Sequence, residues 1–301
     1  MIIDWHRLLC GLGWLMTYTI RDLKNYTEML NVRVLQQKIW GLDDPNIGLY
    51  PPVLNTASKN GGVVLGVFDN ETGEMIGFLF SFLGREPGGP FKLCSQSMGI
   101  LREWRGQGIA EALKRTQRER TLAQSLPLIT WTFDPLEGPN AHLNLHKLRA
   151  ISRTYLRDVY GSNFGVLNAG LPTDRLLVEW WVRGARLERG QDDELDDIWD
   201  SPSVFEIKGQ SPERWIARAD FSLKAETILL ETPADIQVVK AANMELALDW
   251  RLKVRKAFEK YLANGFIAVD YVSVIDRGER RNRYVLQKGT PELLADIGLE
   301  N

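Results

Sequence analysis

The chain has 301 residues, of which 44% are hydrophobic and 25% are charged, and its formal net charge is -2. This composition can fill packed cores, and the length suits about two domains of ~150 residues each. It excludes a disordered chain and a global basic field for nucleic acid or an anionic membrane. We therefore expect no nucleic-acid or membrane partner, and any anionic ligand must be bound locally.

The cysteines and histidines do not predict a metal site. Cys10 and Cys94 lie far apart without a CxxC pattern, which favours a reducing, cytoplasmic location. His142 and His146 share an i, i+4 spacing, but no glutamate follows His142 as a zinc-protease motif requires. We expect no bound metal.

Residues 1–15 are predicted to be an extension ahead of the first domain. The apolar run at 8–16 is shorter than the roughly 20 residues that span a bilayer. Asp4 and the lack of a small-residue cleavage site argue against a secretory signal. Both Met1 and Met16 remain candidates for the natural start.

Hydrophobic periodicity predicts a first α/β unit over residues 16–186. Strands are expected at 17–22, 63–68, 75–83, 91–101, 128–133, 164–167 and 175–182. Helices are expected at 22–40, 109–125 and 140–155, and a loop is expected at 43–62. The order is strand, helix, three strands, helix, strand, helix and two strands.

An acidic, turn-prone stretch at 188–200 marks the boundary to a second lobe, residues 187–301. This lobe is expected to contain a strand at 227–231, a helix at 235–264 and a hairpin formed by 266–275 and 283–286. The order strand, helix, hairpin repeats that of 128–182. The lobe is therefore either a degenerate half-copy of the first unit or an unrelated α/β lobe that extends the sheet.

A glycine-containing loop joins the strand at 91–101 to the next helix. Such a loop at a helix N-terminus presents several backbone N–H groups in one concavity and attracts phosphate. Its residues are Arg105, Gly106, Gln107, Gly108, Ile109 and Ala110. The alternative is an ordinary strand-to-helix turn. Neither the Rossmann pattern nor the P-loop pattern is present.

This strand, loop and helix, with Ile100 preceding Arg105, resemble the R-x-x-G-x-G/A signature of the GNAT superfamily of acyltransferases. The element order of residues 17–182 is similar as well. The resemblance implies a mixed, V-splayed α/β sheet flanked by helices. The Arg-rich helix after Trp250 is similar to that of predicted acetyltransferases that carry a C-terminal extension.

The resemblance also implies a binding site for acetyl-coenzyme A or a longer acyl-coenzyme A. Residues 105–110 would bind its pyrophosphate, and backbone groups of Met98 and Ile100 would pair with the pantetheine arm. Asn140 or Asn144 would contact the pantetheine amides. A helix cap or an exposed helix face is the alternative for each asparagine.

The expected catalytic tyrosine of this family is missing. Leu145 stands at the position where the family has a tyrosine that protonates the thiolate. Tyr155, His146 and Glu179 are therefore the candidate acids and bases. The alternatives are a core aromatic residue for Tyr155, a surface residue for His146, and an ion-paired or solvated carboxylate for Glu179.

The function expected from these features is acyl transfer from coenzyme A to the amine of a small-molecule or amino-acid-like acceptor. The alternative is a non-catalytic acyl-coenzyme A sensor or scaffold. The basic turn that contains Arg277, Arg280, Arg281 and Arg283 is interpreted as a solvated hairpin tip. The identity of the acceptor and homo-oligomer formation are left open.

Overall fold

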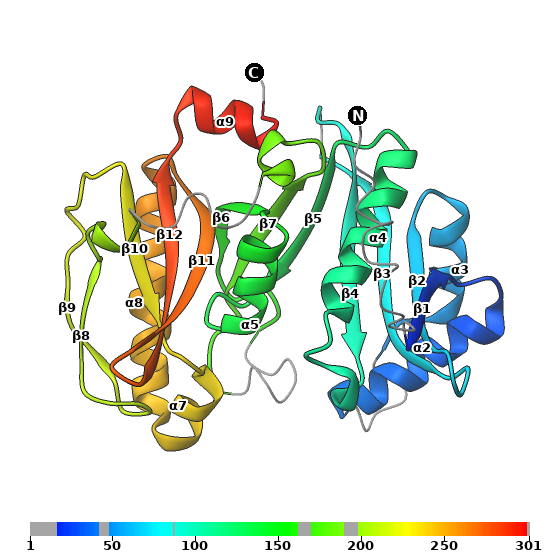
Figure 1. The fold of residues 1–301 in the computed structure, drawn as a ribbon, viewed down its shortest axis with the longest axis horizontal. Helices are drawn as coiled ribbons and strands as arrows, with labels where there is room; N and C mark the ends of the chain where they lie inside the picture. Colours follow the sequence, from blue (N-terminus) through cyan, green and yellow to red (C-terminus); the bar gives the residue numbers. More distant parts are fainter. Residues whose placement is uncertain (1–16, 42–47, 87, 162–169, 190–197, 300–301) are drawn as a thin grey trace, which may run out of the picture. The chain divides into compact units, whose positions relative to one another are not determined.

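The computed structural model describes residues 17–41, 48–86, 88–161, 170–189 and 198–299 (Figure 1). Two compact units divide the chain: unit 1 takes in Met1–Ser81 and Ser97–Thr116, and unit 2 takes in Phe82–Gln96 and Gln117–Asn301. The expected boundary between residues 186 and 187 lies inside unit 2, and as a domain boundary it stays a prediction. The extension at 1–15 and the strand at 164–167 lie outside the described residues.

Unit 1 begins with a strand and two helices. Its elements are β1 (Tyr18–Asp22), α2 (Tyr26–Trp40), α3 (Pro51–Lys59), β2 (Val63–Asp69), most of β3 (Met75–Arg85), the end of β4 (Phe91–Ile100), η1 (Arg102–Trp104) and the start of α4 (Ile109–Ala123). The strands follow in the order β1-β2-β3-β4. The helix α3 was not expected, because the Pro, Asn and Gly content of this segment favoured a loop; Pro51 begins the helix, where a missing N–H costs nothing.

A hydrophobic core ties α2 to the sheet of unit 1. Its buried members are Leu23, Met29, Val32, Leu35, Leu54, Val64, Phe78 and Phe80. Gly99 of β4 allows a close approach of α2, since a Cβ at this position would lie 2.8 Å from Cδ1 of Ile39. The end of β4 is thereby packed tightly where the glycine loop begins.

Unit 2 contains the remaining strands. Its elements are the end of β3, the start of β4, the end of α4, β5 (Leu128–Phe133), α5 (Gly138–Ala141), η2 (His142–Lys147), β6 (Ile151–Leu156), β7 (Arg175–Trp181), η3 (Ala185–Glu188), η4 (Ile198–Asp200), β8 (Phe205–Lys208), β9 (Trp215–Ala219), β10 (Thr227–Thr232), α7 (Ile236–Ala242), α8 (Met244–Ala263), β11 (Phe266–Asp276), β12 (Glu279–Lys288) and α9 (Pro291–Ile297). The strand order is β4-β5-β7-β6-β11-β12-β10, with β8 and β9 as a separate hairpin. β4 runs parallel to β5 through two residue pairs. Antiparallel pairs are formed by β1 with β2, β2 with β3, β5 with β7, β6 with β7, β6 with β11, β11 with β12, β10 with β12 and β8 with β9. The predicted mixed α/β sheet is confirmed.

The repeated order of elements in unit 2 is confirmed too. A strand, a helical segment and two strands occur first as β5 to β7 and again as β10 to β12. The two sets meet through β6 and β11, so the order β5-β7-β6-β11-β12-β10 places equivalent strands at mirrored positions. The long helix α8 packs on β6, β9, β10 and β11 (Figure 1).

The helix expected at 140–155 is wrong. The helical segment consists of α5 and a π-helical η2, and it ends before Arg149, which has a φ of +52°. Ile151, Thr154 and Tyr155 then lie on β6, since β-branched and aromatic residues fit a pleated, half-buried surface. The apolar residues of these two short elements together fit a helical period, which is why the sequence pattern predicted one helix.

The helix expected at 235–264 consists of two helices, α7 and α8. Asn243 separates them in an extended conformation, and its side chain accepts the N–H of Leu246 as the N-cap of α8. Within the described residues, no helix is both long and apolar enough to cross a membrane.

Replacement of Asn243 by alanine is expected to lower the free energy of unfolding by about 1 kcal/mol, because the first turn of α8 loses its capping acceptor. Asn243→Asp keeps an acceptor at this position and is the matched control. Urea unfolding of both variants checks the prediction. An alanine variant as stable as the aspartate variant would contradict it.

Candidate functional site

The loop between β4 and α4 has a backbone that requires glycine. Gly106 and Gly108 have φ values of +78° and +77°, a region that residues with a side chain rarely adopt. A Cβ built at either position would meet no atom within 4 Å, so the space beside both glycines is open. The loop can therefore approach a ligand closely with its backbone.

The N-terminus of α4 follows this loop directly. The N–H of Ala112 donates to the carbonyl of Gly108 at 3.0 Å. The N–H groups of Ile109, Ala110 and Glu111 therefore have no acceptor within the helix. These groups and the positive end of the helix dipole favour an anion. The carboxylate of Glu111 is paired with Arg115 at 2.7 Å, which limits its repulsion of such a ligand.

Two side chains of the loop are anchored to neighbouring backbone. The exposed Arg105 donates from Nε to the carbonyl of Ile100 at 3.1 Å. Gln107 reaches the carbonyl of Glu103 with a weaker bond of 3.5 Å. Among the described residues the Nη atoms of Arg105 have no partner, so its guanidinium can add charge to an anion at the loop.

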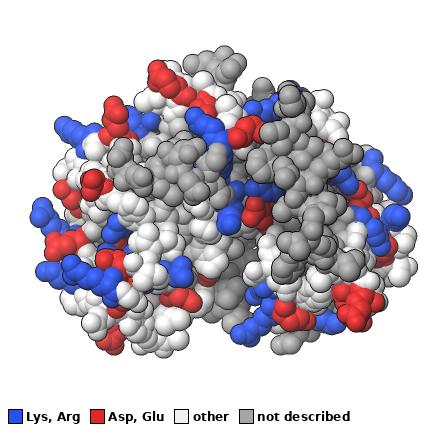
Figure 2. All heavy atoms as spheres, in the orientation of Figure 1, with Lys and Arg blue, Asp and Glu red and all other residues white. Residues whose placement is uncertain are grey.

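Charges of both signs are mixed on the face drawn in Figure 2. Figure 2 shows Lys and Arg side chains interspersed with Asp and Glu side chains on the visible face. This agrees with the net charge of -2. An anion would therefore be bound by local groups such as those of the loop.

The residues expected to contact pantetheine differ in burial. Met98 is half-buried and Ile100 is buried, both on β4. Asn140 is exposed on α5, whereas Asn144 is buried on η2 and accepts a hydrogen bond from Nε1 of Trp131 at 3.2 Å. One asparagine is thus accessible and the other is held in place.

Leu145 and the candidate acid Tyr155 lie on different elements. Leu145 is fully buried on η2. Tyr155 lies on β6, where its ring stacks on Phe258 and its hydroxyl donates to Asp174 at 2.7 Å. Burial and the charge of Asp174 raise the pKa of Tyr155, so the phenol stays protonated and its proton is directed to Asp174.

His146 and Glu179 are held by charged partners as well. Nδ1 of His146 lies 3.1 Å from Oδ1 of Asp270, and its ring stacks on that of His142 at 4.6 Å. Asp270 belongs to β11, three strands beyond β5 in the strand order. Glu179 accepts two bonds from Arg153, at 2.6 and 3.1 Å, and is therefore ion-paired.

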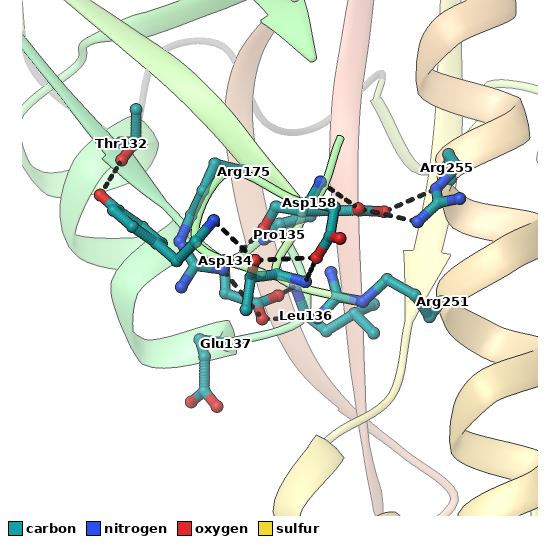
Figure 3. A network of polar contacts seen from close by, with 12 residues as sticks. Thr132, Asp134, Pro135, Leu136, Glu137, Asp158, Arg175, Arg251 and Arg255 are labelled. Atoms are coloured by element: carbon teal, nitrogen blue, oxygen red, sulfur yellow. Dashed lines mark hydrogen bonds and ion pairs between the residues drawn. The ribbon is translucent and has the colours of Figure 1, made fainter. Parts of the chain in front are cut away.

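A buried network of arginines and aspartates was missed by the sequence reasoning (Figure 3). Arg251 is 1% exposed and lies 2.5 Å from Oδ2 of Asp134, at the end of β5. Arg255, one turn later on α8, holds both oxygens of the buried Asp174 at 2.7 and 2.8 Å. Arg175 of β7 lies 3.6 Å from Asp134. The i, i+4 arginines within the apolar period of α8 are the sequence signal for this network.

Burial shifts the pKa values of three of these groups. It lowers the pKa of Arg175. For Asp174, burial would raise the pKa, but hydrogen bonds from Arg255 and Tyr155 outweigh it and hold the pKa below its usual value. For Arg251, burial opposes the charged form, while Asp134 outweighs it and raises the pKa. The partners therefore favour the charged forms of Asp174 and Arg251, whereas burial disfavours the charged form of Arg175.

No protein-family model matches this sequence, and no curated protein matches it. Several solved structures are similar. The ribosomal-protein-S18-alanine N-acetyltransferase from Escherichia coli has 12% identity and a TM-score of 0.42, over 54% of this chain and 92% of that chain. The acetyltransferase of GNAT family from Streptococcus pneumoniae has 15% identity and a TM-score of 0.43, over 54% and 97%. The GNAT superfamily phosphinothricin acetyltransferase from Sinorhizobium meliloti, in complex with AcCoA, has 17% identity and a TM-score of 0.42, over 55% and 88%.

Glu137→Gln is expected to raise the free energy of unfolding near neutral pH. Burial, with the charges of Asp134 and Asp235, raises the pKa of Glu137. The folded state therefore holds this proton more tightly than the unfolded chain, and wild-type stability falls as pH rises from the unfolded pKa through the folded pKa. Glutamine removes this loss and can still accept from Gln237.

Urea unfolding between about pH 4 and pH 8 measures this effect. The exposed Glu71→Gln serves as the control. If Glu137→Gln and wild type show the same pH dependence, the assignment of a raised pKa is wrong.

Proposed function

We propose that the protein is an acyl-coenzyme A-dependent N-acyltransferase, with acetyl-coenzyme A or a longer acyl-coenzyme A as the donor. The observation that carries this proposal is the loop with Gly106 and Gly108 at the start of α4. Its open side, its helix N–H groups and Arg105 supply the donors and the positive charge that a diphosphate requires. The GNAT signature that spans these residues points to coenzyme A as the molecule that carries the diphosphate.

The remaining cofactor contacts are carried over from the same resemblance. Backbone groups of Met98 and Ile100 pair with the pantetheine arm in this proposal, and Asn140 or Asn144 contacts its amides. The exposed Asn140 is accessible to such a ligand. The acceptor is the amine of a small-molecule or amino-acid-like compound, and the reaction takes place in the cytoplasm.

Acyl transfer forms a bond from the amine nitrogen to the acyl carbon and breaks the bond from that carbon to sulfur. The amine must lose a proton and the thiolate must gain one. Among Tyr155, His146 and Glu179, His146 is the candidate base because Nδ1 is oriented by Asp270 and Nε2 has no partner among the described residues. Tyr155 is the candidate acid as the remaining O–H donor of the three, and in this role its hydroxyl would exchange its bond to Asp174 for one to the thiolate.

One observation favours a second function, a non-catalytic sensor or scaffold that binds acyl-coenzyme A. All three candidate catalytic side chains are engaged by charged partners, and Leu145 occupies the position of the family's tyrosine. A protein that only binds the thioester needs the loop but no acid or base. The two functions share the cofactor and differ in turnover.

Gly108→Val is expected to abolish acetyl-coenzyme A binding in calorimetry, because a β-branched residue disfavours a φ of +77° and its side chain enters the open space beside the loop. Gly73→Val is the matched control. Gly73 has a φ of +72° and open space around its Cβ position, but it lies in the turn between β2 and β3. Both variants are expected to lose stability, on the order of 1–2 kcal/mol. Retained binding in Gly108→Val would remove the loop assignment.

The rate of thiol release from acetyl-coenzyme A is expected to be higher in the presence of a suitable primary amine, found from a panel, than in the absence of amine. His146→Gln is expected to lower kcat by about 10²- to 10⁴-fold without changing acetyl-coenzyme A affinity, since a base acts on the proton transfer. Lys147→Gln is the neighbouring control. Tight cofactor binding without release for any amine would favour the sensor, and an unchanged kcat in His146→Gln would exclude this histidine as the base.

A further inference from the structure

The turn at residues 134–138, between β5 and α5, is held from the C-terminal lobe (Figure 3). Asp134 begins it, and one oxygen of this carboxylate accepts the N–H of Leu136 at 2.8 Å. The other oxygen lies 2.5 Å from the guanidinium of Arg251 on α8. One oxygen of Asp134 is therefore bound within the turn, and the other is bound to the lobe.

Three further elements of the lobe meet the next residues of the turn. The hydroxyl of Tyr284 on β12 donates to the carbonyl of Pro135 at 2.7 Å. Gln237 on α7 donates to Glu137 at 2.6 Å. A Cβ at Gly138 would lie 3.0 Å from the hydroxyl of Tyr271 on β11, so the lobe packs closely on the turn.

Two of the side chains that hold the turn, Tyr284 and Arg251, are buried, so their contacts are firmer than surface contacts would be. Tyr284 is fully buried, and Arg251 is 1% exposed. A buried phenol or guanidinium that lost its acceptor would remain desolvated, and this penalty keeps the acceptor in place. The backbone of the turn is thus fixed by side chains that are more than ninety residues away along the chain.

The segment after the turn has little stability of its own. α5 has four residues and η2 is a six-residue π-helix, and both are shorter than helices that persist alone. This segment carries Asn140 and Asn144. The turn fixes where this segment starts, while η2 is anchored further on by the bonds of Asn144 to Trp131 and of His146 to Asp270.

We propose that the C-terminal lobe is a positioning element: Arg251, Tyr284 and Gln237 hold the turn and thereby place α5, whose exposed Asn140 contacts the pantetheine arm in the proposed function. This inference rests on the proposed function for its ligand. It gives the lobe a role in acyl-coenzyme A affinity in addition to its role in stability.

The test compares two tyrosines that each lose one phenol-to-carbonyl bond on replacement by phenylalanine. Tyr284→Phe removes the bond to Pro135 in the turn. Tyr261→Phe removes a bond of 3.2 Å to the carbonyl of Asp220, outside the turn, from a side chain that is 2% exposed. Arg251→Lys and Arg255→Lys form a second matched pair on α8, since Arg255 binds Asp174 instead of the turn.

Amide hydrogen exchange in the absence of any ligand is the first measurement. Tyr284→Phe is expected to speed exchange across residues 136–147 by about 3- to 10-fold, which corresponds to the loss of one hydrogen bond, while Tyr261→Phe leaves this segment unchanged. Equal exchange in the two variants would overturn the inference that the lobe holds the turn, whatever ligand the protein binds.

Acetyl-coenzyme A affinity, measured by calorimetry, is the second measurement. Its Kd is expected to rise by about 3- to 10-fold in Tyr284→Phe and to stay at the wild-type value in Tyr261→Phe, because fewer molecules hold the binding-competent turn. Faster exchange with an unchanged Kd would overturn the positioning role. Absence of binding by the wild type would overturn the cofactor assignment, and the exchange data would still decide whether the lobe holds the turn.

Discussion

Arg251 and Arg255 lie one turn apart on α8, and each meets an aspartate that folding has removed from water. Asp134 ends β5, and Asp174 directly precedes β7. Removal of one partner from a buried pair typically costs 3–5 kcal/mol, because the remaining charge is uncompensated. A shift of α8 along its axis would break both pairs at once. The position of this helix against the strand ends is therefore fixed more strictly than apolar packing alone would fix it.

In the mirrored strand order of unit 2, α8 both links β10 to β11 and contacts the turn that follows β5. α8 links β10 to β11, as the segment with α5 and η2 links β5 to β6. The first link is 20 residues of regular helix, whereas the second consists of short irregular turns. The regular helix supplies the arginine that fixes the start of the irregular link. The second set of elements thus supports the set that precedes it through the contact of Arg251 with Asp134.

The sequence predicted elements where one period was dominant. β2, β5, β7 and α4 have nearly the expected bounds, since their apolar pattern is continuous. The prediction from sequence failed at η2 and β6. Leu148, Ala150 and Ile151 lie at the junction of these two elements, and because all three are buried they still fit one helical period. The loop glycines could be predicted because a positive φ is a local property. The Arg251–Asp134 pair could not, because it joins residues whose proximity depends on the completed fold.

In the proposed function, cofactor binding and catalysis would place different demands on the chain. A diphosphate needs N–H groups and charge in one short segment, and residues 105–111 supply them within a few positions of each other. Proton transfer needs side chains with an uncommitted proton or lone pair at the reacting atoms. Tyr155 directs its proton to Asp174, and Glu179 is saturated by Arg153. The imidazole of His146 retains one nitrogen that Asp270 does not occupy, so in the proposed reaction this atom is the candidate proton acceptor.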